Sequence, residues 1–110
     1  MSQPVQVGLI GSQFISTIHA RAVRRCTEAS LLAVASPTPG NAAKLAREFD
    51  IPHYFVDHHH LLALDELEMA VIGAPNDVHC QLTLDCAAAG KHVVLEKPMC
   101  LTLDEADRMI

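Results

Sequence analysis

Long apolar runs and closely spaced cysteine pairs are both missing from this sequence. No apolar run approaches the roughly 20 residues that a membrane-spanning helix needs. The opening residues MSQPVQ lack a charged segment followed by an apolar one, so we expect no secretory signal. None of the 4 cysteines is spaced C-x-x-C from another, which argues against a disulfide framework or a zinc ribbon. Scattered cysteines in apolar segments are usually small buried residues, and together these features favour a reduced, cytoplasmic setting.

The sequence also lacks the basic stripe that nucleic-acid-binding proteins usually carry. It has 8 Lys and Arg against 13 Asp and Glu, a formal net charge of −5. The one basic cluster, Arg21, Arg24 and Arg25, indicates the exposed face of a helix. We therefore expect no nucleic-acid partner. Hydrophobic residues make up 50% of the 110, so the chain can bury a core as one domain and disorder is not expected.

Short apolar runs alternate with stretches of helical periodicity. The runs are typical of buried parallel strands and cover residues 5–10, 31–35, 54–56, 69–72 and 93–95. Strands that alternate with helices predict an α/β fold, with a parallel sheet covered by helices on both faces. We expect four side chains to be buried in the middle of the sheet: Val7, Val34, Ile72 and Val94.

The helical stretches carry apolar residues at a spacing that indicates which side faces the core. The predicted helices start at Phe14, after a cap at Asn41, at His58 and after the turn at residues 75–77. The side chains expected to face inward are Ile15, Ile18 and Ala22 in the first, Leu45, Ala46 and Phe49 in the second, and Val78, Leu82, Cys86 and Ala89 in the fourth.

A last helix is expected to begin at Thr102. Thr102 and Glu105 form a capping box, and Leu101 and Ala106 are placed as a hydrophobic staple. The sequence stops at Ile110 without a helix stop signal. We therefore interpret residues 1–110 as an incomplete N-terminal domain, truncated at its C-terminus.

Four turns should meet at one edge of the sheet, because ligands of open parallel sheets bind beyond the carboxyl ends of the strands. These turns are residues 11–16, 36–40, 73–77 and 96–98. The first compares with the dinucleotide fingerprint G-x-G-x-x-G: Gly11 matches its first glycine, while Gln13 and Ser16 replace the other two. One glycine of three is a weak match, and an ordinary strand–helix turn is the alternative. The helix N-terminus still offers free N–H groups to a phosphate, which makes Gly11, Ser12, Gln13 and Phe14 candidate contacts.

The second turn bears on the choice between NAD and NADP. Ser36 stands where an acidic residue would bind the ribose hydroxyls of NAD, and no arginine is adjacent to bind a 2′-phosphate. A proline-stiffened loop with no role is the alternative, and the cofactor remains NAD or NADP.

Lys97 is the candidate catalytic residue. It follows a buried strand and lies between Glu96 and Pro98, so its ammonium could be presented rigidly to a substrate oxygen. A solvated charge at a strand end is the alternative.

Residues 87–98, AAAGKHVVLEKP, resemble the A-G-K-H-V-x-x-E-K-P signature of the glucose–fructose oxidoreductase / inositol dehydrogenase (Gfo/Idh/MocA) family. Pro75-Asn76 with His79 is similar to the family's x-P-N-x-x-H turn, and residues 8–11 with His19-Ala20 to its first strand and helix. The matching positions run from about Val5 to Ala106. The G-K-H…E-K-P stretch is specific, the glycine loop is not, and Gln13 departs from the family's usual glycine.

The resemblance implies a Rossmann-like domain that binds NAD or NADP for hydride transfer to or from a sugar, polyol or related small molecule. It places Lys97 near nicotinamide and substrate, and it implies a cis peptide before Pro98. It also implies a second domain, absent here, that binds the substrate. We also expect a homo-oligomer, because an open sheet edge can pair with another copy. The candidate cofactor contacts are Gly11, Ser12, Gln13, Phe14, Ser36, Pro75, Asn76, His79, Glu96 and Lys97. A non-catalytic nucleotide-binding or interaction module of the same fold is the alternative.

Metal binding is not expected. His58, His59 and His60 are consecutive, and consecutive helical residues point about 100° apart, so the three cannot converge on one ion. His79 and Cys80 lack a third ligand in register, and Ser12 and Ser16 lack the G-x-S-x-G context of a serine hydrolase.

Overall fold

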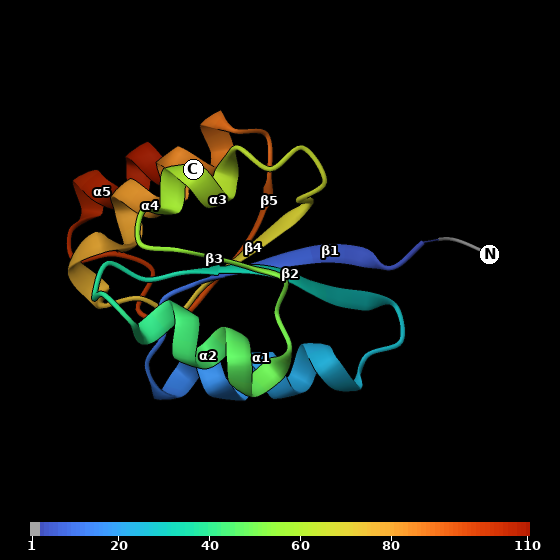
Figure 1. Ribbon diagram of the computed structural model, residues 1–110. Helices are drawn as coiled ribbons and strands as arrows, with labels where there is room; N and C mark the ends of the chain where they lie inside the picture. The colour runs from blue at the N-terminus through green and yellow to red at the C-terminus, as the bar shows by residue number, and fades with distance from the viewer. Residues whose placement is uncertain (1–2) are drawn as a thin grey trace.

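The computed structural model describes residues 3–110, so Met1 and Ser2 of the predicted domain lie outside the described residues. A single parallel sheet forms the centre of the molecule (Figure 1). Its strands are β1 (Val5–Ile10), β2 (Ala29–Ala35), β3 (His53–Phe55), β4 (Met69–Ile72) and β5 (His92–Leu95), in the order β3-β2-β1-β4-β5. All four pairings are parallel. The predicted α/β, Rossmann-like fold is confirmed.

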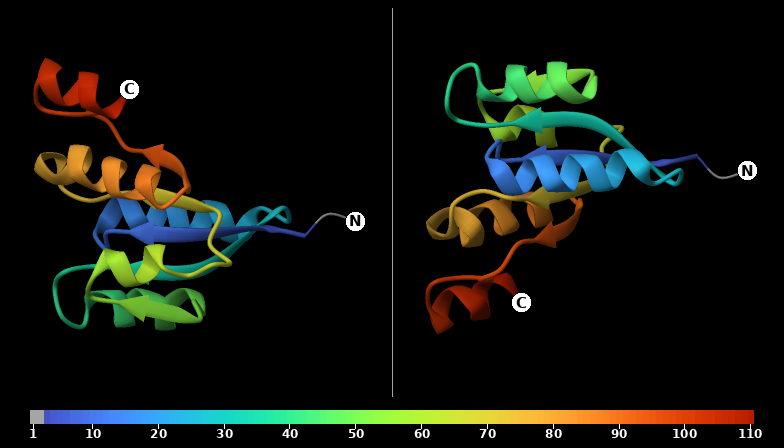
Figure 2. Two further views of the ribbon diagram at one scale, coloured as in Figure 1. Left: turned by 90° about the horizontal axis from the view of Figure 1, so that it is seen from above. Right: turned by 90° about the horizontal axis from the view of Figure 1, so that it is seen from below.

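Helices cover both faces of the sheet, as Figures 1 and 2 show. α1 (Phe14–Arg25) and α2 (Asn41–Phe49) lie on one face. α3 (His58–Leu62) and α4 (His79–Ala88) lie on the other, with α5 (Leu103–Met109) packed against α4. A short 3₁₀ helix, η1 (Asn76–Val78), leads into α4. None of the helices within residues 3–110 is long and apolar enough to cross a membrane.

Each face of the sheet has its own apolar core, because successive residues of a strand point to opposite faces. On the first face, β-strand residues such as Leu9 and Val34 pack with Leu45 and Phe49 of α2. On the second, Ile10 and Ile72 pack with residues of α3 and α4 that include Leu61, Leu82 and Cys86. Because both faces are buried, the strands carry apolar residues at successive positions rather than alternating apolar and polar residues.

Val94 is the exception among the four side chains expected in the middle of the sheet. Val7, Val34 and Ile72 are at most 2% exposed, whereas Val94 is 43% exposed. Val94 pairs in register with Val71, whose side chain belongs to the core under α1 and α2. Those helices cover the centre of the sheet and its β3 side, so the same face of the edge strand β5 is left open (Figure 2). The prediction for Val94 was wrong because an edge position is not visible in the apolar run itself.

Two predicted helix faces also need correction. In α1 the buried residues are Ser16 and Ala20, while Ile18 is 42% exposed and Ala22 is exposed. The small residues let α1 approach the sheet closely, so the larger Ile18 faces away. In α4, Leu82 and Cys86 are buried as expected but Ala89 is exposed, as is Val78 ahead of the helix.

The ends of the helices follow local chemistry. Gly40, not Asn41, caps α2, with a φ of 87° that suits glycine. At α5 Thr102 caps the helix as expected, because the Glu105 N–H donates to Thr102 Oγ1 over 3.2 Å. The return bond of the expected capping box is shifted by one residue: Glu105 Oε1 accepts the N–H of Leu101 over 2.9 Å, not that of Thr102. The Lys97–Pro98 peptide is cis, as predicted.

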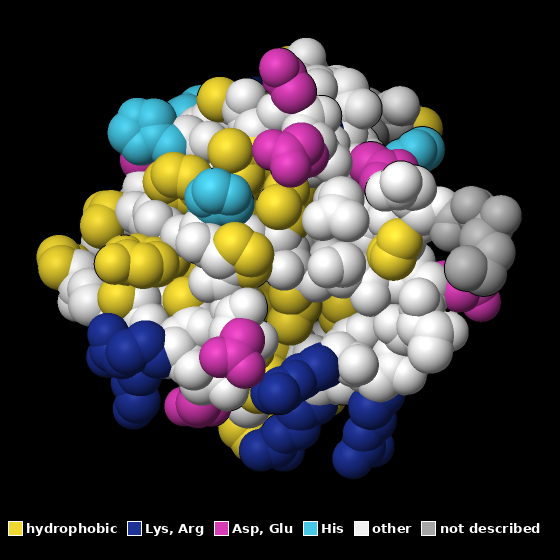
Figure 3. Space-filling model, turned by 45° about the vertical axis from the view of Figure 1, so that its right-hand side comes forward, with side chains coloured by type: hydrophobic (Ala, Val, Ile, Leu, Met, Phe, Trp, Pro, Cys, Tyr) yellow, Lys and Arg dark blue, Asp and Glu magenta, His cyan; other side chains and the backbone are white. Residues whose placement is uncertain are grey.

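Basic side chains gather on the side of the molecule covered by α1 and α2 (Figure 3). The arginines of the sequence cluster, Arg21, Arg24 and Arg25, are all exposed on α1, as predicted. Histidines lie on the opposite side in the same view, while acidic side chains appear on both sides.

Candidate functional site

Gly11 sets the geometry of the turn between β1 and α1. Its φ is 112°, and a Cβ added there would lie 2.7 Å from the Gly73 carbonyl oxygen. The Gly11 N–H donates to the Ala35 carbonyl over 2.8 Å, and the Gly73 N–H donates to the Ile10 carbonyl over 2.9 Å. Only glycine fits this position, because the ends of β1, β2 and β4 are joined here at close range.

Ser16 occupies the place of the third glycine of the fingerprint. It is 2% exposed, and a Cβ on Gly73 would lie 2.9 Å from its Oγ. The close approach between helix and strand is therefore made by a serine on α1 and a glycine after β4. A glycine on the helix is not needed for it.

The N-terminus of α1 faces the same edge of the sheet. Gln13 is its N-cap residue but its side chain makes no capping hydrogen bond, and the first turn holds no acidic residue. The first N–H groups of a helix have no acceptor within the helix, and its dipole places a partial positive charge there. This end of α1 is suited to an anionic group.

A cavity of about 370 Å³ lies at the carboxyl ends of the strands. Five of the predicted cofactor contacts line it: Gly11, Ser12, Gln13, Ser36 and Pro75. Ser12 and Ser36, which are 24 residues apart, are joined by a 2.7 Å hydrogen bond from one hydroxyl to the other. The convergence expected for the turns after β1, β2 and β4 is therefore present.

The segment after β3 was not among the turns predicted to form the site. Val56 and His58 line the cavity, together with Thr38, Asn41 and Asp77 from segments already considered. The rule that selected the other turns also applies to β3, because its carboxyl end lies at the same edge. Extending that rule to the short third strand would have found both residues.

Five predicted contacts do not line this cavity: Phe14, Asn76, His79, Glu96 and Lys97. Phe14 is 77% exposed, and Asn76 is exposed in η1. His79 is 1% exposed, with Nδ1 at 2.8 Å from the Pro98 carbonyl oxygen and Nε2 at 2.8 Å from that of Ala74. Its expected role as a cofactor contact needs correction, because both ring nitrogens contact backbone carbonyls. The ring thereby connects the turn after β4 with the turn after β5.

Glu96 and Lys97 lie on a second hollow of about 420 Å³, beside β5. Glu96 Oε1 is 2.7 Å from His19 Nε2, which joins the end of β5 to α1. Lys97 is exposed, next to the cis peptide. The two candidate residues therefore lie at the same edge of the sheet but outside the cavity formed by the other turns.

Known proteins resemble the chain over almost its whole length. The family model described as an oxidoreductase family with an NAD-binding Rossmann fold matches residues 5–110. The chain is 29% identical to a myo-inositol 2-dehydrogenase of Thermotoga maritima and 35% identical to a trans-1,2-dihydrobenzene-1,2-diol dehydrogenase of Sus scrofa, with 96% of the chain covered in each case. The crystal structure of an NAD binding oxidoreductase from Klebsiella pneumoniae superposes with a TM-score of 0.92 at 29% identity and covers 98% of the chain. The chain spans about a third of these proteins, 32%, 31% and 31% of their lengths.

Proposed function

Because the chain belongs to the oxidoreductase family with an NAD-binding Rossmann fold, we propose that it holds NAD or NADP in the cavity at the carboxyl ends of its strands. One observation carries the proposal: segments that follow four different strands, β1, β2, β3 and β4, line a single cavity of about 370 Å³. The strand order reverses at β1, which lies between β2 and β4. Ligands of doubly wound sheets bind at such a point.

The pyrophosphate is proposed to lie over residues 11–14. Gly11 has no side chain, so a ligand can approach the backbone closely there. The N-terminus of α1 supplies N–H groups and a favourable dipole. Gln13 is exposed rather than packed inward, so its side-chain amide can donate a hydrogen bond to a phosphate oxygen.

The adenosine ribose is proposed to lie over the turn after β2. Ser36 and Thr38 line the cavity there, and the acidic residue among the lining side chains, Asp77, follows β4 instead. No carboxylate of the lining set therefore repels a 2′-phosphate at the turn after β2. We propose that both NAD and NADP are accepted.

The parent enzyme is proposed to transfer hydride between the cofactor and a hydroxyl or carbonyl carbon of a sugar, polyol or related small molecule. The nicotinamide ring supplies or accepts the hydride when the cofactor is bound. Lys97 would direct its ammonium at the substrate oxygen and stabilise negative charge there, while the His19 contact holds the neighbouring Glu96. The similarity to an inositol dehydrogenase supports this class of substrate.

A non-catalytic nucleotide-binding module of the same fold is the second candidate. It is favoured by Gln13 in place of a glycine and by the position of Lys97 outside the cofactor cavity. The sequence of the full-length protein distinguishes the two, because the enzyme needs a further domain that supplies an acid and a histidine.

We also propose a cytoplasmic setting and self-association. The cysteines of the described chain are all free, in keeping with a reduced compartment. β5 is an edge strand with Val94 exposed, and such an edge can pair with a second copy.

Titration of NADH and NADPH fluorescence against the purified chain tests the proposal. Both cofactors are expected to bind, with a change in nicotinamide emission that saturates at one cofactor per chain. Binding should be lost in Ser12→Trp, which fills the cavity, and retained in Thr27→Trp, which adds the same side chain at an exposed position between α1 and β2. Saturable binding that is equally strong in Ser12→Trp contradicts the proposed site.

A further inference from the structure

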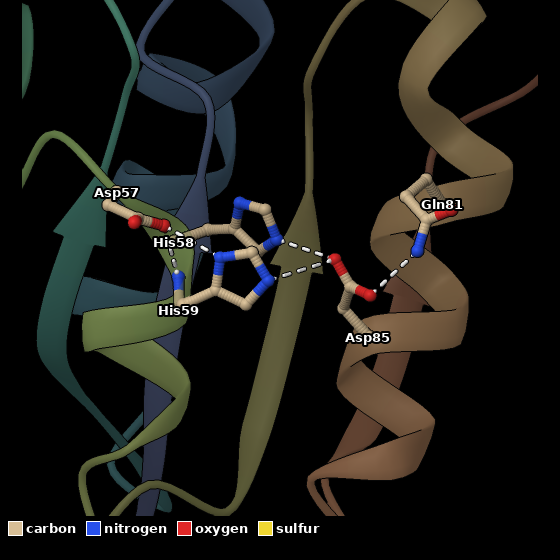
Figure 4. A network of polar contacts seen from close by, with 5 residues as sticks. All are labelled: Asp57, His58, His59, Gln81 and Asp85. Carbon is tan, nitrogen blue, oxygen red and sulfur yellow. Dashed lines mark hydrogen bonds and ion pairs between the residues drawn. The ribbon is translucent and has the colours of Figure 1, made fainter.

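Two histidines of α3 and an aspartate of α4 converge on one point (Figure 4). Asp85 Oδ2 lies 2.7 Å from His58 Nε2 and 3.5 Å from His59 Nε2. The two imidazole rings lie side by side, with their centroids 4.1 Å apart. A single carboxylate oxygen therefore faces a nitrogen of each of two rings.

Asp57 fixes which nitrogen of His59 is free. Its Oδ1 lies 2.8 Å from His59 Nδ1 and also accepts the His59 backbone N–H over 2.9 Å. A carboxylate at that distance requires the ring proton on Nδ1, so in the neutral ring Nε2 carries a lone pair. This lone pair is directed at the Asp85 oxygen, 3.5 Å away, and a positive charge between the two atoms would satisfy both.

Gln81 orients Asp85 in the same way. It lies one turn earlier on α4 and donates from Nε2 to Asp85 Oδ1 over 2.8 Å. The other oxygen, Oδ2, is left for the two histidines (Figure 4). Metal-binding side chains are typically oriented by such additional hydrogen bonds. A metal-binding histidine often donates its other ring N–H to a carboxylate, and a metal-binding carboxylate accepts a hydrogen bond itself.

We propose that His58 Nε2, His59 Nε2 and Asp85 Oδ2 bind a divalent transition-metal ion such as Zn²⁺, with a water molecule in the fourth position. At Zn–N and Zn–O distances of about 2.0–2.2 Å, two ligands of a tetrahedral ion lie about 3.3 Å apart. The His59–Asp85 spacing of 3.5 Å already fits. The His58–Asp85 pair, at 2.7 Å, has to open by about 0.6 Å and exchanges its hydrogen bond for two metal bonds.

The sequence predicts no metal at these histidines because the three alone cannot converge on one ion. His60 does point elsewhere: its ring lies edge-on to Phe55, with centroids 6.1 Å apart. Asp85, which completes the set, lies 26 residues after His59, so the sequence did not connect it with the histidines. The ion would join α3 to α4, and His58 also lines the cofactor cavity, so the site would brace one wall of that cavity.

Calorimetric titration of the untagged chain with Zn²⁺ near pH 7.5 tests the proposal. One Zn²⁺ per chain is expected, and Co²⁺ should give the visible absorption of a tetrahedral ion. His59→Ala and Asp85→Asn should each weaken Zn²⁺ binding at least tenfold. His60→Ala, which removes a neighbouring histidine outside the cluster, should bind Zn²⁺ as the wild type does. Asp57→Asn should weaken binding by about 10–100-fold while keeping the stoichiometry.

Thermal unfolding with and without Zn²⁺ separates a metal site from simple ion pairs between α3 and α4. Ion pairs alone predict a lower Tm in the variants but no response of any protein to Zn²⁺. A metal site predicts that Zn²⁺ raises the Tm of the wild type and of His60→Ala, but not that of His59→Ala or Asp85→Asn. If His59→Ala does not fold, His58→Gln takes its place in both measurements. The proposal is overturned if the wild type does not respond to Zn²⁺, or if His59→Ala and Asp85→Asn bind as tightly as the wild type.

Discussion

Gly11 is constrained both by its backbone angle and by its neighbours. Gly11→Ala is expected to lower the free energy of unfolding. Backbone strain of a side-chain-bearing residue at a φ of 112° costs about 1–3 kcal/mol, and the contact of the new Cβ with the Gly73 carbonyl adds to that cost. Urea denaturation measures the loss. Gly40→Ala is the matched control, since Gly40 also has a positive φ but nothing lies within 4 Å of an added Cβ. An equal loss in both variants would show that the contact with Gly73 does not matter.

Ser36 is the residue at which cofactor preference can be tested. Ser36→Asp should weaken NADPH binding at least tenfold more than NADH binding, because the new carboxylate repels a 2′-phosphate and can accept hydrogen bonds from ribose hydroxyls. The ratio of the two dissociation constants measures this. Ser36→Asn is the neutral control of similar size and should leave the ratio unchanged. A change of ratio in both variants would assign the effect to loss of the Ser12–Ser36 hydrogen bond instead.

Cys86 should be chemically inert in the folded protein. Burial raises the pKa of its thiol to about 11, and the nearby Asp85 carboxylate acts in the same direction. At pH 8 a thiol reagent should therefore modify exposed Cys26 and leave Cys86 unmodified, as peptide mass spectrometry can show. Because the folded pKa is raised, the protonated thiol contributes stability that is lost as pH rises from about 9 through 11. Rapid labelling of Cys86 at pH 8 in protein that remains folded would contradict this.

At the scale of helices and strands, the sequence predicted the central strands best, although β2 begins at Ala29, two residues before the predicted run. β1 and β4 have the predicted bounds, Val5–Ile10 and Met69–Ile72, and both lie in the interior of the sheet. The sequence predicted strand β5 but not the exposure of Val94, because apolar composition does not indicate which strand lies at the edge of the sheet. The turns after β1, β2 and β4 converge as the topology dictates. The position of Lys97 relative to the cavity depends on packing around the cis turn, which spacing alone does not encode.

Val71 and Val94 are a matched pair for testing the open face of β5. They lie in register on neighbouring strands, but Val71 is 6% exposed and Val94 is 43% exposed. Val71→Thr should cost about 1–3 kcal/mol of unfolding free energy, because it buries a hydroxyl in an apolar core. Val94→Thr should stay within about 0.5 kcal/mol, as expected for a surface substitution. Comparable losses in denaturation experiments would indicate that Val94 is covered in solution, for instance by a second copy of the chain.

For the whole molecule, we expect the described domain to be inactive as an isolated chain. Holding substrate and nicotinamide at reacting distance can contribute roughly 7–11 kcal/mol to lowering the barrier, and an exposed Lys97 cannot enclose a substrate. Assays of NAD(P)H turnover with a panel of polyols and sugars should therefore show no activity above background. Turnover that disappears in Lys97→Ala would show instead that the active site is complete within this chain.

The central position of β1 has a consequence for how the chain folds during synthesis. Of the five described strands β1 is made first, yet its two neighbours, β2 and β4, begin at Ala29 and Met69. Strands β1 to β3 with α1 and α2 can form a half-sheet first, and one edge of β1 then stays unpaired while the next 13 residues, 56 to 68, are added. An unpaired strand edge recruits other chains, so nascent chains that end before β4 should be the aggregation-prone intermediates of this protein. Chaperone binding should accordingly peak at chain lengths just short of β4.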